Sequence, residues 1–259
     1  MIPADATPDA RPAARLDQAA GLVFVGEMYG VQVDLLALAL STSQRRASAV
    51  AGRWCDAGSA QAAILGPGPR WVWLTKAGLA TSGLPYAPAV PGLSRLAHLR
   101  AVTAVRLALA AAPQFDAGGA HWRSERRIRS RIGGRIGLRE HVPDAEVHWP
   151  DGTTLAWAGE CWAIEAELTP KTVARTAGIM RELLARTGDY GCRPADVLVP
   201  GAPPRHARAV YVCSAAARPV LMKARALLGD LGARVEIRSL PGSALLPAPG
   251  RPAGPADRR

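Results

Sequence analysis

The sequence predicts a protein of mixed α+β and α/β class, built from two folded units joined by a helical connector. Residues 15–84 show helical apolar periods followed by two short apolar strands. Residues 118–241 contain strands with acidic residues and end with a strand–helix–strand pattern. The connector covers residues 85–117. Residues 1–14 and 242–259 are rich in Pro, Ala, Gly and charge without an apolar period, so they are predicted to be disordered tails.

Three helices are predicted at the start of the first unit. The first spans residues 16–29 and ends at Gly30, because glycine tolerates the backbone conformation that commonly follows a helix. The second spans residues 33–38. A Ser-Thr-Ser turn then provides the cap for a third helix at residues 44–56, which stops before Gly58.

The third predicted helix has two distinct faces. Its apolar residues recur at the spacing of one helical face, and they are Ala47, Val50, Ala51 and Trp54. Its arginines project from the other side, at Arg45, Arg46 and Arg53. A DNA recognition helix needs this arrangement, with an anchored stripe behind and cationic side chains towards the groove.

A strand hairpin is predicted to follow the third helix. Residues 62–65 and 71–74 form its strands, and residues 66–70 form a tip that could lay Arg70 along a phosphate backbone. Residues 15–84 are therefore predicted to be a winged helix-turn-helix that binds double-stranded DNA. The alternative is a winged helix used for protein contact or dimerisation. The three tryptophans of this unit are predicted to pack in its core.

The charge of the chain also points to a polyanionic partner. The formal net charge is +11, and the sequence pI is about 10.5. Residues 123–139 hold one acid, Glu125, and seven arginines: Arg123, Arg126, Arg127, Arg129, Arg131, Arg135 and Arg139. Because guanidinium groups suit phosphate oxygens, four of these are expected to contact DNA without reading its sequence, namely Arg126, Arg127, Arg129 and Arg131. The alternatives are a solvated or acid-paired face, and a composition that a GC-rich genome produces.

Composition argues against several classes of protein. No apolar run reaches the roughly 18 residues of a membrane span, and the N-terminus lacks the pattern of a signal peptide. A cytoplasmic location without membrane partners is therefore expected. The cysteines are widely spaced and form no C-x-x-C pair, which argues against a zinc site and a disulfide framework. They are predicted to be buried free thiols: Cys55, Cys161, Cys192 and Cys213.

The connector and the end of the second unit complete the predicted elements. An apolar helix at residues 93–112 is expected to pack between the two units, and its His98 is interpreted as a structural histidine. An amphipathic helix is predicted at residues 172–186. A strand, a helix and a strand follow at residues 210–213, 221–231 and 235–238, a pattern that adds parallel strands to a sheet.

An acid-rich strand is the most informative stretch of the second unit. Residues 161–171 alternate apolar with small or acidic side chains, so Glu165 and Glu167 point to the same face of a strand. Asp144 precedes another predicted strand, residues 145–149, and could complete a three-carboxylate cluster for a hard divalent metal. The alternative places the two glutamates on a solvent face, paired with nearby arginines.

Turn and cap signals predict how these strands connect. An Asp-Gly-Thr turn indicates a hairpin that would bring residues 145–149 beside a strand at residues 154–157. The strand of Glu165 would come next in the sheet. Thr169 and Pro170 then have the character of an N-cap and a first helical residue. The predicted order along the chain is therefore Asp144, a β-hairpin, the strand with Glu165 and Glu167, and a helix.

This order resembles the restriction-endonuclease-like nucleases with a Pro-Asp…(Asp/Glu)-x-Lys core. The resemblance covers roughly residues 118–240 and implies a restriction-endonuclease-like domain with a mixed β-sheet flanked by helices. Asp144 matches the metal-binding aspartate of the family, and Glu165 matches its second acid. Glu167 stands where the family usually has lysine. Residues 121–127 look like the first core helix of the family.

The resemblance also implies catalytic roles. Asp144 and Glu165 would hold Mg²⁺ or Mn²⁺, which makes a hydroxide available and offsets charge on the scissile phosphate. Glu167 would be a further ligand or a general base, and Lys171 would supply the charge of the missing lysine. Glu125 could reach a water on the metal. The competing hypothesis is a non-catalytic regulator or accessory protein that uses the nuclease fold as a platform for DNA or protein.

The two-domain order is similar to one group, the replication-relaxation proteins of actinobacterial plasmids and integrative elements. In that group a winged N-terminal domain precedes an endonuclease-like domain. The segments that carry the similarity are residues 71–78, 96–98, 122–125, 141–144 and 164–171. Membership would imply action on a mobile element, in plasmid replication, relaxation or transfer. A relaxase, or another plasmid replication or transfer protein, is the protein partner it would imply.

Overall fold

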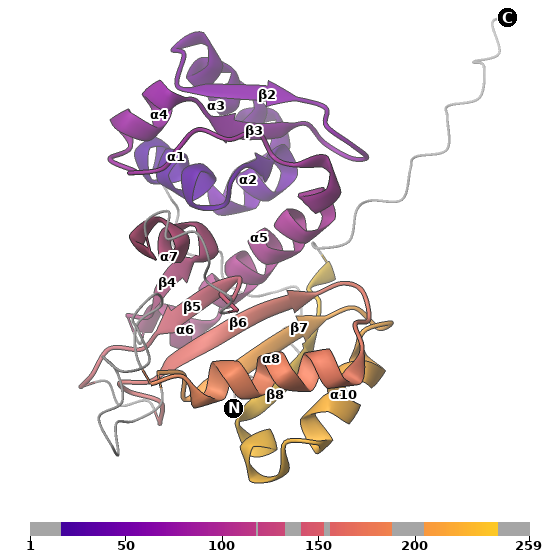
Figure 1. The fold of residues 1–259 in the computed structure, drawn as a ribbon. Helices are drawn as coiled ribbons and strands as arrows, with labels where there is room; N and C mark the ends of the chain where they lie inside the picture. The colour runs from indigo at the N-terminus through magenta and orange to yellow at the C-terminus, as the bar shows by residue number, and fades with distance from the viewer. Residues whose placement is uncertain (1–16, 118, 133–140, 153–155, 188–204, 243–259) are drawn as a thin grey trace, which may run out of the picture.

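A computed structural model describes five stretches of the chain, residues 17–117, 119–132, 141–152, 156–187 and 205–242. Within them the protein is mixed α+β, and Figure 1 shows two units, one above and one below a connecting helix. Arg135 and Arg139 of the arginine-rich segment, together with Cys192, lie outside the described residues. No helix in the described stretches is long and apolar enough to cross a membrane.

The first unit contains three helices, a small sheet and a fourth short helix. In chain order the elements are α1 (Gln18–Glu27), β1 (Val31–Gln32), α2 (Val33–Ala39), α3 (Gln44–Asp56), β2 (Ala60–Ala63), β3 (Trp71–Leu74) and α4 (Lys76–Thr81). The sheet is antiparallel with strand order β1-β3-β2. The strand β1, which the sequence analysis did not predict, pairs Val31 with Val72.

Local capping fixes the bounds of these helices. Ser43 Oγ accepts a hydrogen bond from the backbone N–H of Arg46, so α3 begins at the predicted residue. Thr75 caps α4 in the same way. Gly78 in α4 is required by close approach, because a Cβ there would lie 1.8 Å from the carbonyl oxygen of Ser59. The first helix ends earlier than predicted, since Tyr29 already has a φ of 62°.

The core of the first unit lies between its helices and its sheet. Val25 on α1, Leu36 on α2, Ala51 on α3 and Val72 on β3 are all inaccessible to solvent. The tryptophans of this unit are buried, which confirms their predicted role in packing: Trp54, Trp71 and Trp73. The arginine face of α3 is left on the outside of the unit.

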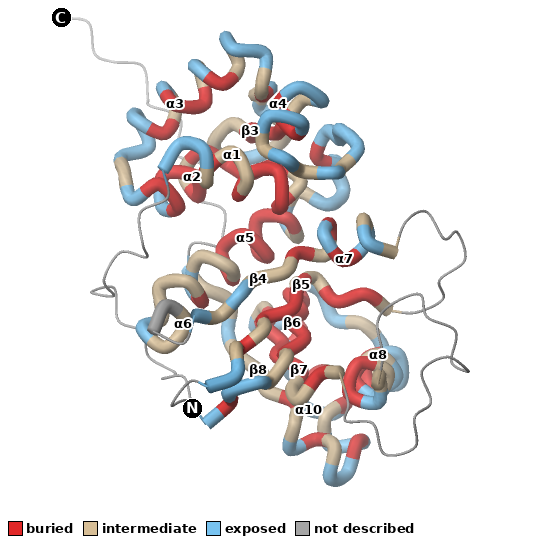
Figure 2. The backbone as a smooth tube through the Cα atoms, turned by 90° about the vertical axis from the view of Figure 1, so that its left-hand side faces the viewer, coloured by how far each residue is buried: buried red, intermediate tan, exposed pale blue. Residues whose placement is uncertain are grey.

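A central helix joins the two units. It comprises η1 (Leu93–Arg95) and α5 (Leu96–Ala110) and is followed by α6 (Pro113–Ala117). Ala101 and Val102 belong to the core of the first unit, whereas Val105 and Leu109 belong to the core beneath the larger sheet. Figure 2 shows α5 as a largely buried segment between the units. The predicted packing of this helix between the units is confirmed.

The second unit is built on a mixed five-stranded sheet of order β4-β5-β6-β7-β8. Its elements are β4 (His121–Ser124), α7 (Glu125–Ile132), β5 (Ala145–His148), β6 (Cys161–Glu167), α8 (Val173–Ala185), β7 (Arg208–Cys213), α10 (Arg218–Ala226), η2 (Gly229–Arg234) and β8 (Val235–Ser239). Pairing is antiparallel from β4 to β6 and parallel from β6 to β8. The predicted parallel strands at the end of the chain are therefore confirmed.

Three local predictions in the second unit are wrong. Residues 121–124, predicted as helix, form an edge strand, and the helix begins only at Glu125. The strand β5 pairs directly with β6, so the strand predicted at residues 154–157 does not lie between them. Residues 154 and 155 are outside the described residues, and Trp157 lies in a turn, where its ring packs on Trp149 at a centroid distance of 5.4 Å. The helix after β6 begins at Val173, because Thr172 rather than Thr169 accepts the capping hydrogen bond.

Candidate functional site

One face of the sheet in the second unit packs as an apolar core, and the other carries acidic side chains beside a second apolar cluster. Val147 and Ile164 lie in the apolar core that α5 covers. Strand alternation places Glu146, Glu165 and Glu167 on the other face, which α8 and α10 cover. Glu165 is 6% exposed and Glu167 is 8% exposed. The predicted alternative of a solvent face for the two glutamates is therefore wrong.

Asp144 lies at the edge of the sheet, directly before β5. Its Oδ2 accepts a hydrogen bond of 2.8 Å from the backbone N–H of Ala166, which extends the contact between β5 and β6. Its Oδ1 lies 2.8 Å from Nε2 of His98 on α5. Burial lowers the pKa of His98, but the hydrogen bond and charge of Asp144 outweigh burial and raise it above its ordinary value. His98 is thus a partner of the predicted site, a role the sequence did not reveal.

Glu165 has a histidine partner of its own. His141 Nε2 lies 2.6 Å from Glu165 Oε1, and the backbone N–H of His141 donates to Glu182 on α8. Burial, together with the charge of Asp144, raises the pKa of Glu165 to about 7. The surroundings of this buried carboxyl therefore compensate the charge of its ionised form only in part.

Glu167 and Tyr211 complete this edge of the sheet. Lys171 Nζ donates to Glu167 Oε2 at 2.5 Å, from a position just before α8. Tyr211 on β7 lies opposite Glu165 in the parallel register and is 2% exposed. Its hydroxyl has no hydrogen-bond partner among the described residues. Burial, then the charges of Glu165, Glu167 and Asp144, raises the pKa of that hydroxyl.

We call Asp144, Glu165, Glu167 and Lys171, with the two histidines that contact them, the acid edge. The sheet brings these predicted residues together, but each carboxylate is held by a different basic group. Carboxylate oxygens suit Mg²⁺ and Mn²⁺, and the partly compensated charge around Glu165 favours a cation. The ligand types therefore suit a hard divalent ion, although the three carboxylates do not form a metal-sized group within the described residues.

Glu125 is linked to the acid edge through its backbone. Its N–H donates to the carbonyl oxygen of Asp144, whereas its carboxylate pairs with Arg95 and Arg129 at 2.9 and 2.7 Å. Glu125, Asp144 and His98 line a cavity of about 20 Å³, which is room for one water. The predicted reach of Glu125 to a metal-bound water stays a prediction.

Seven of the eight predicted DNA-contacting arginines fall into three groups. Three side chains on the outer face of α3 are exposed and have no acidic partner among the described residues: Arg45, Arg46 and Arg53. On α7, Arg127, Arg129 and Arg131 are exposed, with Arg129 paired to Glu125. Arg70 is half-buried and donates to the carbonyl oxygen of Ser48 at 3.0 Å.

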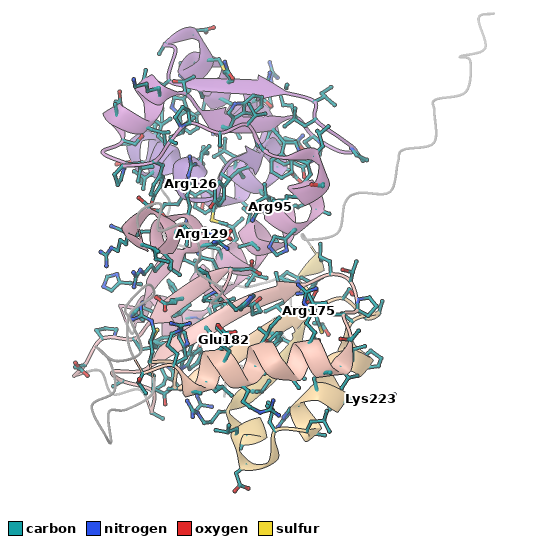
Figure 3. The ribbon with its side chains drawn as sticks, in the orientation of Figure 1. Arg95, Arg126, Arg129, Arg175, Glu182 and Lys223 are labelled. Atoms are coloured by element: carbon teal, nitrogen blue, oxygen red, sulfur yellow. The ribbon has the colours of Figure 1, made fainter. Side chains whose placement is uncertain are left out.

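Arg126 does not belong to an exposed cationic face, so its prediction as a DNA contact is wrong. It is 6% exposed and donates to the carbonyl oxygens of Gly26 and Ala87, each at 2.6 Å. Its guanidinium also stacks between the rings of Tyr29 and Tyr86. Figure 3 places Arg126 at the junction of the two units, where it joins α7 to the end of α1.

Replacing Arg126 with alanine is expected to lower the free energy of unfolding by about 1–3 kcal/mol, because the buried carbonyl oxygen of Gly26 loses its donor. The neighbouring Arg127 is exposed and provides the matched control. Its replacement with alanine should change stability by less than about 0.5 kcal/mol. Denaturant unfolding measures the stability of both variants. Equal losses of stability would contradict a structural role for Arg126 at the junction.

A second cluster, formed around Glu146, was not predicted. Glu146 is inaccessible to solvent and pairs with Arg123, Arg205, His148 and His206. Burial raises the pKa of Glu146, but these hydrogen bonds and charges outweigh it and hold the pKa far below its usual range. One signal was present in the sequence, since Glu146 and His148 alternate on one strand face.

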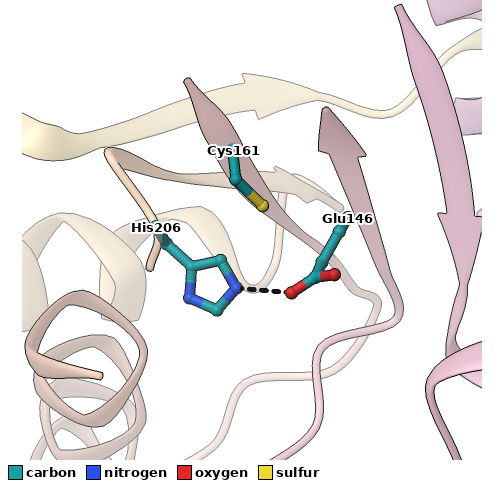
Figure 4. A group of neighbouring side chains, drawn as sticks. All are labelled: Glu146, Cys161 and His206. Atoms are coloured by element: carbon teal, nitrogen blue, oxygen red, sulfur yellow. Dashed lines mark hydrogen bonds and ion pairs between the residues drawn. The ribbon is translucent and has the colours of Figure 1, made fainter. Parts of the chain in front are cut away.

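Cys161 lies beside this second cluster (Figure 4). Ligand atoms of Glu146, Cys161 and His206 all lie within 4.8 Å of one another. This geometry differs from that of the acid edge, where the three carboxylates do not form such a group within the described residues. Burial, then the charge of Glu146, raises the pKa of the Cys161 thiol above its ordinary value.

Comparison with known proteins adds no family to this description. No family model matches the chain, and no curated protein or solved structure is significantly similar to it. The functional argument therefore depends on the residues and their arrangement.

Proposed function

We propose that the protein binds double-stranded DNA, with the first unit acting as a winged helix-turn-helix and α3 as its recognition helix. The observation that carries this proposal is the outer face of α3, where Arg45, Arg46 and Arg53 are exposed without acidic partners among the described residues. Guanidinium groups in that state are available to phosphate oxygens and base edges. The antiparallel β2–β3 pair supports the proposal, because it follows α3 as a wing would.

The second unit adds a basic surface near the junction. Arg127 and Arg131 are exposed on α7. Side chains of this kind neutralise phosphates without reading sequence, so they would strengthen binding to any duplex. The same surface lies close to Asp144, because β4 and α7 are linked to β5 by sheet pairing and by the Glu125–Asp144 backbone hydrogen bond.

The test compares two triple variants of the full chain. Replacing Arg45, Arg46 and Arg53 with alanine should weaken duplex binding and make the slope of log K against log salt shallower by about 2.7, from three lost phosphate contacts. The matched control removes the same charge from α8 and α10, at Arg175, Arg218 and Lys223, of which Figure 3 labels Arg175 and Lys223. Fluorescence anisotropy at several salt concentrations measures both. Equal effects of the two triple variants would contradict a recognition role for α3.

A second proposal concerns the acid edge, as a site of metal-dependent phosphodiester hydrolysis. It is favoured by the buried Glu165, whose pKa is raised beside Asp144, and by the unpartnered hydroxyl of Tyr211. Asp144 and Glu165 would hold Mg²⁺ or Mn²⁺, which supplies hydroxide and Lewis acidity when bound. Lys171 would stabilise negative charge developing on the phosphate. The order of Asp144, β5, β6 and α8 supports a restriction-endonuclease-like unit.

Asp144→Asn should abolish metal-dependent nicking of supercoiled plasmid while duplex affinity in EDTA is retained. Glu236→Gln, at a half-buried acid of β8, is the control that should leave nicking unchanged. Gel assays with Mg²⁺ and with Mn²⁺ measure the effect. If the parent protein binds duplex but never nicks it, the second unit is a non-catalytic platform, and the protein is a regulator or relaxase accessory factor. Either outcome keeps the proposed setting of a mobile element in replication, relaxation or transfer.

A further inference from the structure

We propose that Cys161, His148, His206 and Glu146 form a zinc site, which we call the histidine–cysteine cluster. It lies on the same sheet face as the acid edge but nearer the other end of β5 and β6. His148 and Cys161 are direct cross-strand partners. His206 comes from the segment that leads into β7.

The ligand atoms are already close together. His206 Nε2 lies 2.9 Å from Glu146 Oε1, and His148 Nε2 lies 3.1 Å from Glu146 Oε2. Cys161 Sγ lies 3.7 Å from His148 Nε2. Zinc–ligand bonds of about 2.0–2.3 Å place neighbouring ligands of a tetrahedral site at separations of this size. The imidazole of His206, the sulfur of Cys161 and the carboxylate of Glu146 therefore lie as close together as the ligands of a single ion, and His148 adjoins them.

The orientation of His206 is an independent observation. Its side chain is inaccessible to solvent, and its Nδ1 lies 2.9 Å from the carbonyl oxygen of Leu183 on α8. A carbonyl oxygen only accepts, so Nδ1 carries a proton. With an ion bound, the ring would be neutral and Nε2 would direct its lone pair toward that ion, beside Glu146 and Cys161. Metal-binding histidines are commonly oriented by such a hydrogen bond from the second ring nitrogen.

The donor set selects the metal. Sulfur and imidazole nitrogen favour zinc over Mg²⁺ or Mn²⁺, which prefer oxygen ligands. Four protein ligands are typical of structural zinc sites, and His148, whose Nε2 lies 3.7 Å from the Cys161 sulfur, would be the fourth. A zinc ion here would join β5, β6 and the start of β7, and its role would be to hold the sheet together.

The alternative to a zinc site is a cluster of ion pairs that stabilises the sheet without a metal. Arg123 and Arg205 contact both oxygens of Glu146 between them and already compensate its charge. In that case His206 Nε2 would carry a second proton and donate it to Glu146. This arrangement would leave Cys161 without a metal and would give zinc no effect on it.

The test uses the untagged full chain, stripped with a chelator and titrated with ZnCl₂. We expect about one ion per chain to bind, and Co²⁺ at the same site to show a thiolate-to-metal charge-transfer band. At a zinc concentration about ten times the Kd, alkylation of Cys161 should slow roughly tenfold. Peptide mapping measures this rate, with the half-buried Cys55 as an internal control whose alkylation should stay unchanged.

Variants separate this site from the acid edge. Cys161→Ser should remove the charge-transfer band, whereas Cys55→Ser and Asp144→Asn should retain it. If Cys161→Ser fails to fold, the effect of zinc on the alkylation rate of Cys161 in the parent chain still tests the proposed site. Unchanged alkylation of Cys161 in zinc, or a cobalt band that survives Cys161→Ser, would overturn the proposal.

Discussion

Glu146→Gln is expected to lower the free energy of unfolding of the metal-free protein by about 3–5 kcal/mol. The substitution keeps the size of the side chain but removes the charge that compensates Arg123 and Arg205. An amide also cannot accept all five of the hydrogen bonds that reach the carboxylate oxygens. Buried cationic groups would then lack a counter-charge.

Glu236→Gln is the matched control for that measurement. Glu236 also pairs with an arginine, Arg238, but on a half-buried side chain of β8. A partly solvated pair of this kind contributes about 0–1 kcal/mol. Urea unfolding in EDTA measures both variants at neutral pH. Comparable losses in the two would mean that the Glu146 cluster does not anchor the sheet.

Glu165→Gln is expected to do the opposite and to stabilise the metal-free protein at alkaline pH. The pKa of Glu165 in the folded protein is raised from 4.5 to about 7, so the folded state binds a proton more tightly than the unfolded state. Stability should therefore fall as pH rises from 4.5 towards 7. The amide variant should remove that loss and be more stable than the parent by roughly 3 kcal/mol at pH 8.

The groups that face Glu165 set the shape of this pH dependence. Asp144 opposes its ionisation, whereas His141 and Lys171 favour it. Burial lowers the pKa of His141, but its contacts with Glu165 outweigh burial and raise it, so His141 also loses stabilising charge as pH rises. Thermal unfolding across pH 5–8 measures both effects. A parent protein whose stability rises with pH over that range would contradict the partly compensated charge of Glu165.

Magnesium provides a second readout of the same prediction. An ion that binds only the folded acid edge stabilises it by mass action, and most strongly where Glu165 is ionised. Added Mg²⁺ should therefore raise the Tm of the parent at pH 8 more than at pH 5. The rise should be absent in Glu165→Gln. If Mg²⁺ leaves the Tm unchanged at both pH 5 and pH 8, the proposed metal binding at the acid edge would be wrong. The DNA-binding proposal would be unaffected.

Local patterns in the sequence predicted the elements whose signals are themselves local. The helix α3 was placed at its observed bounds because a serine cap precedes it and its apolar residues follow a helical period. The strands and helix at the end of the chain were recognised for similar reasons, although α10 ends earlier and continues as η2. The edge strand β4 was missed, since its four residues carry no clear alternation and its strand state depends on pairing with β5.

The partners of the candidate site could not be predicted, because they come from distant parts of the chain. Asp144 was identified from its place before a strand, but His98 contacts it from a helix that begins almost fifty positions earlier. Arg126 looked like a surface charge, and only the tertiary arrangement reveals that it donates to carbonyl oxygens of α1 and of the loop after α4. Cysteine spacing also gave no hint of Cys161 beside two histidines.

The position of Ala166 has a consequence for cooperativity. This residue stands between the two glutamates of the acid edge, yet its side chain belongs to the apolar cluster that contains Leu36 and Val102. Neither unit can open without exposing part of the other, so local unfolding of one is energetically coupled to the other. A duplex held on α3 would therefore slow amide hydrogen exchange in β6. If the first unit binds DNA as proposed, its occupancy and the rigidity of the acid edge would be linked in one equilibrium.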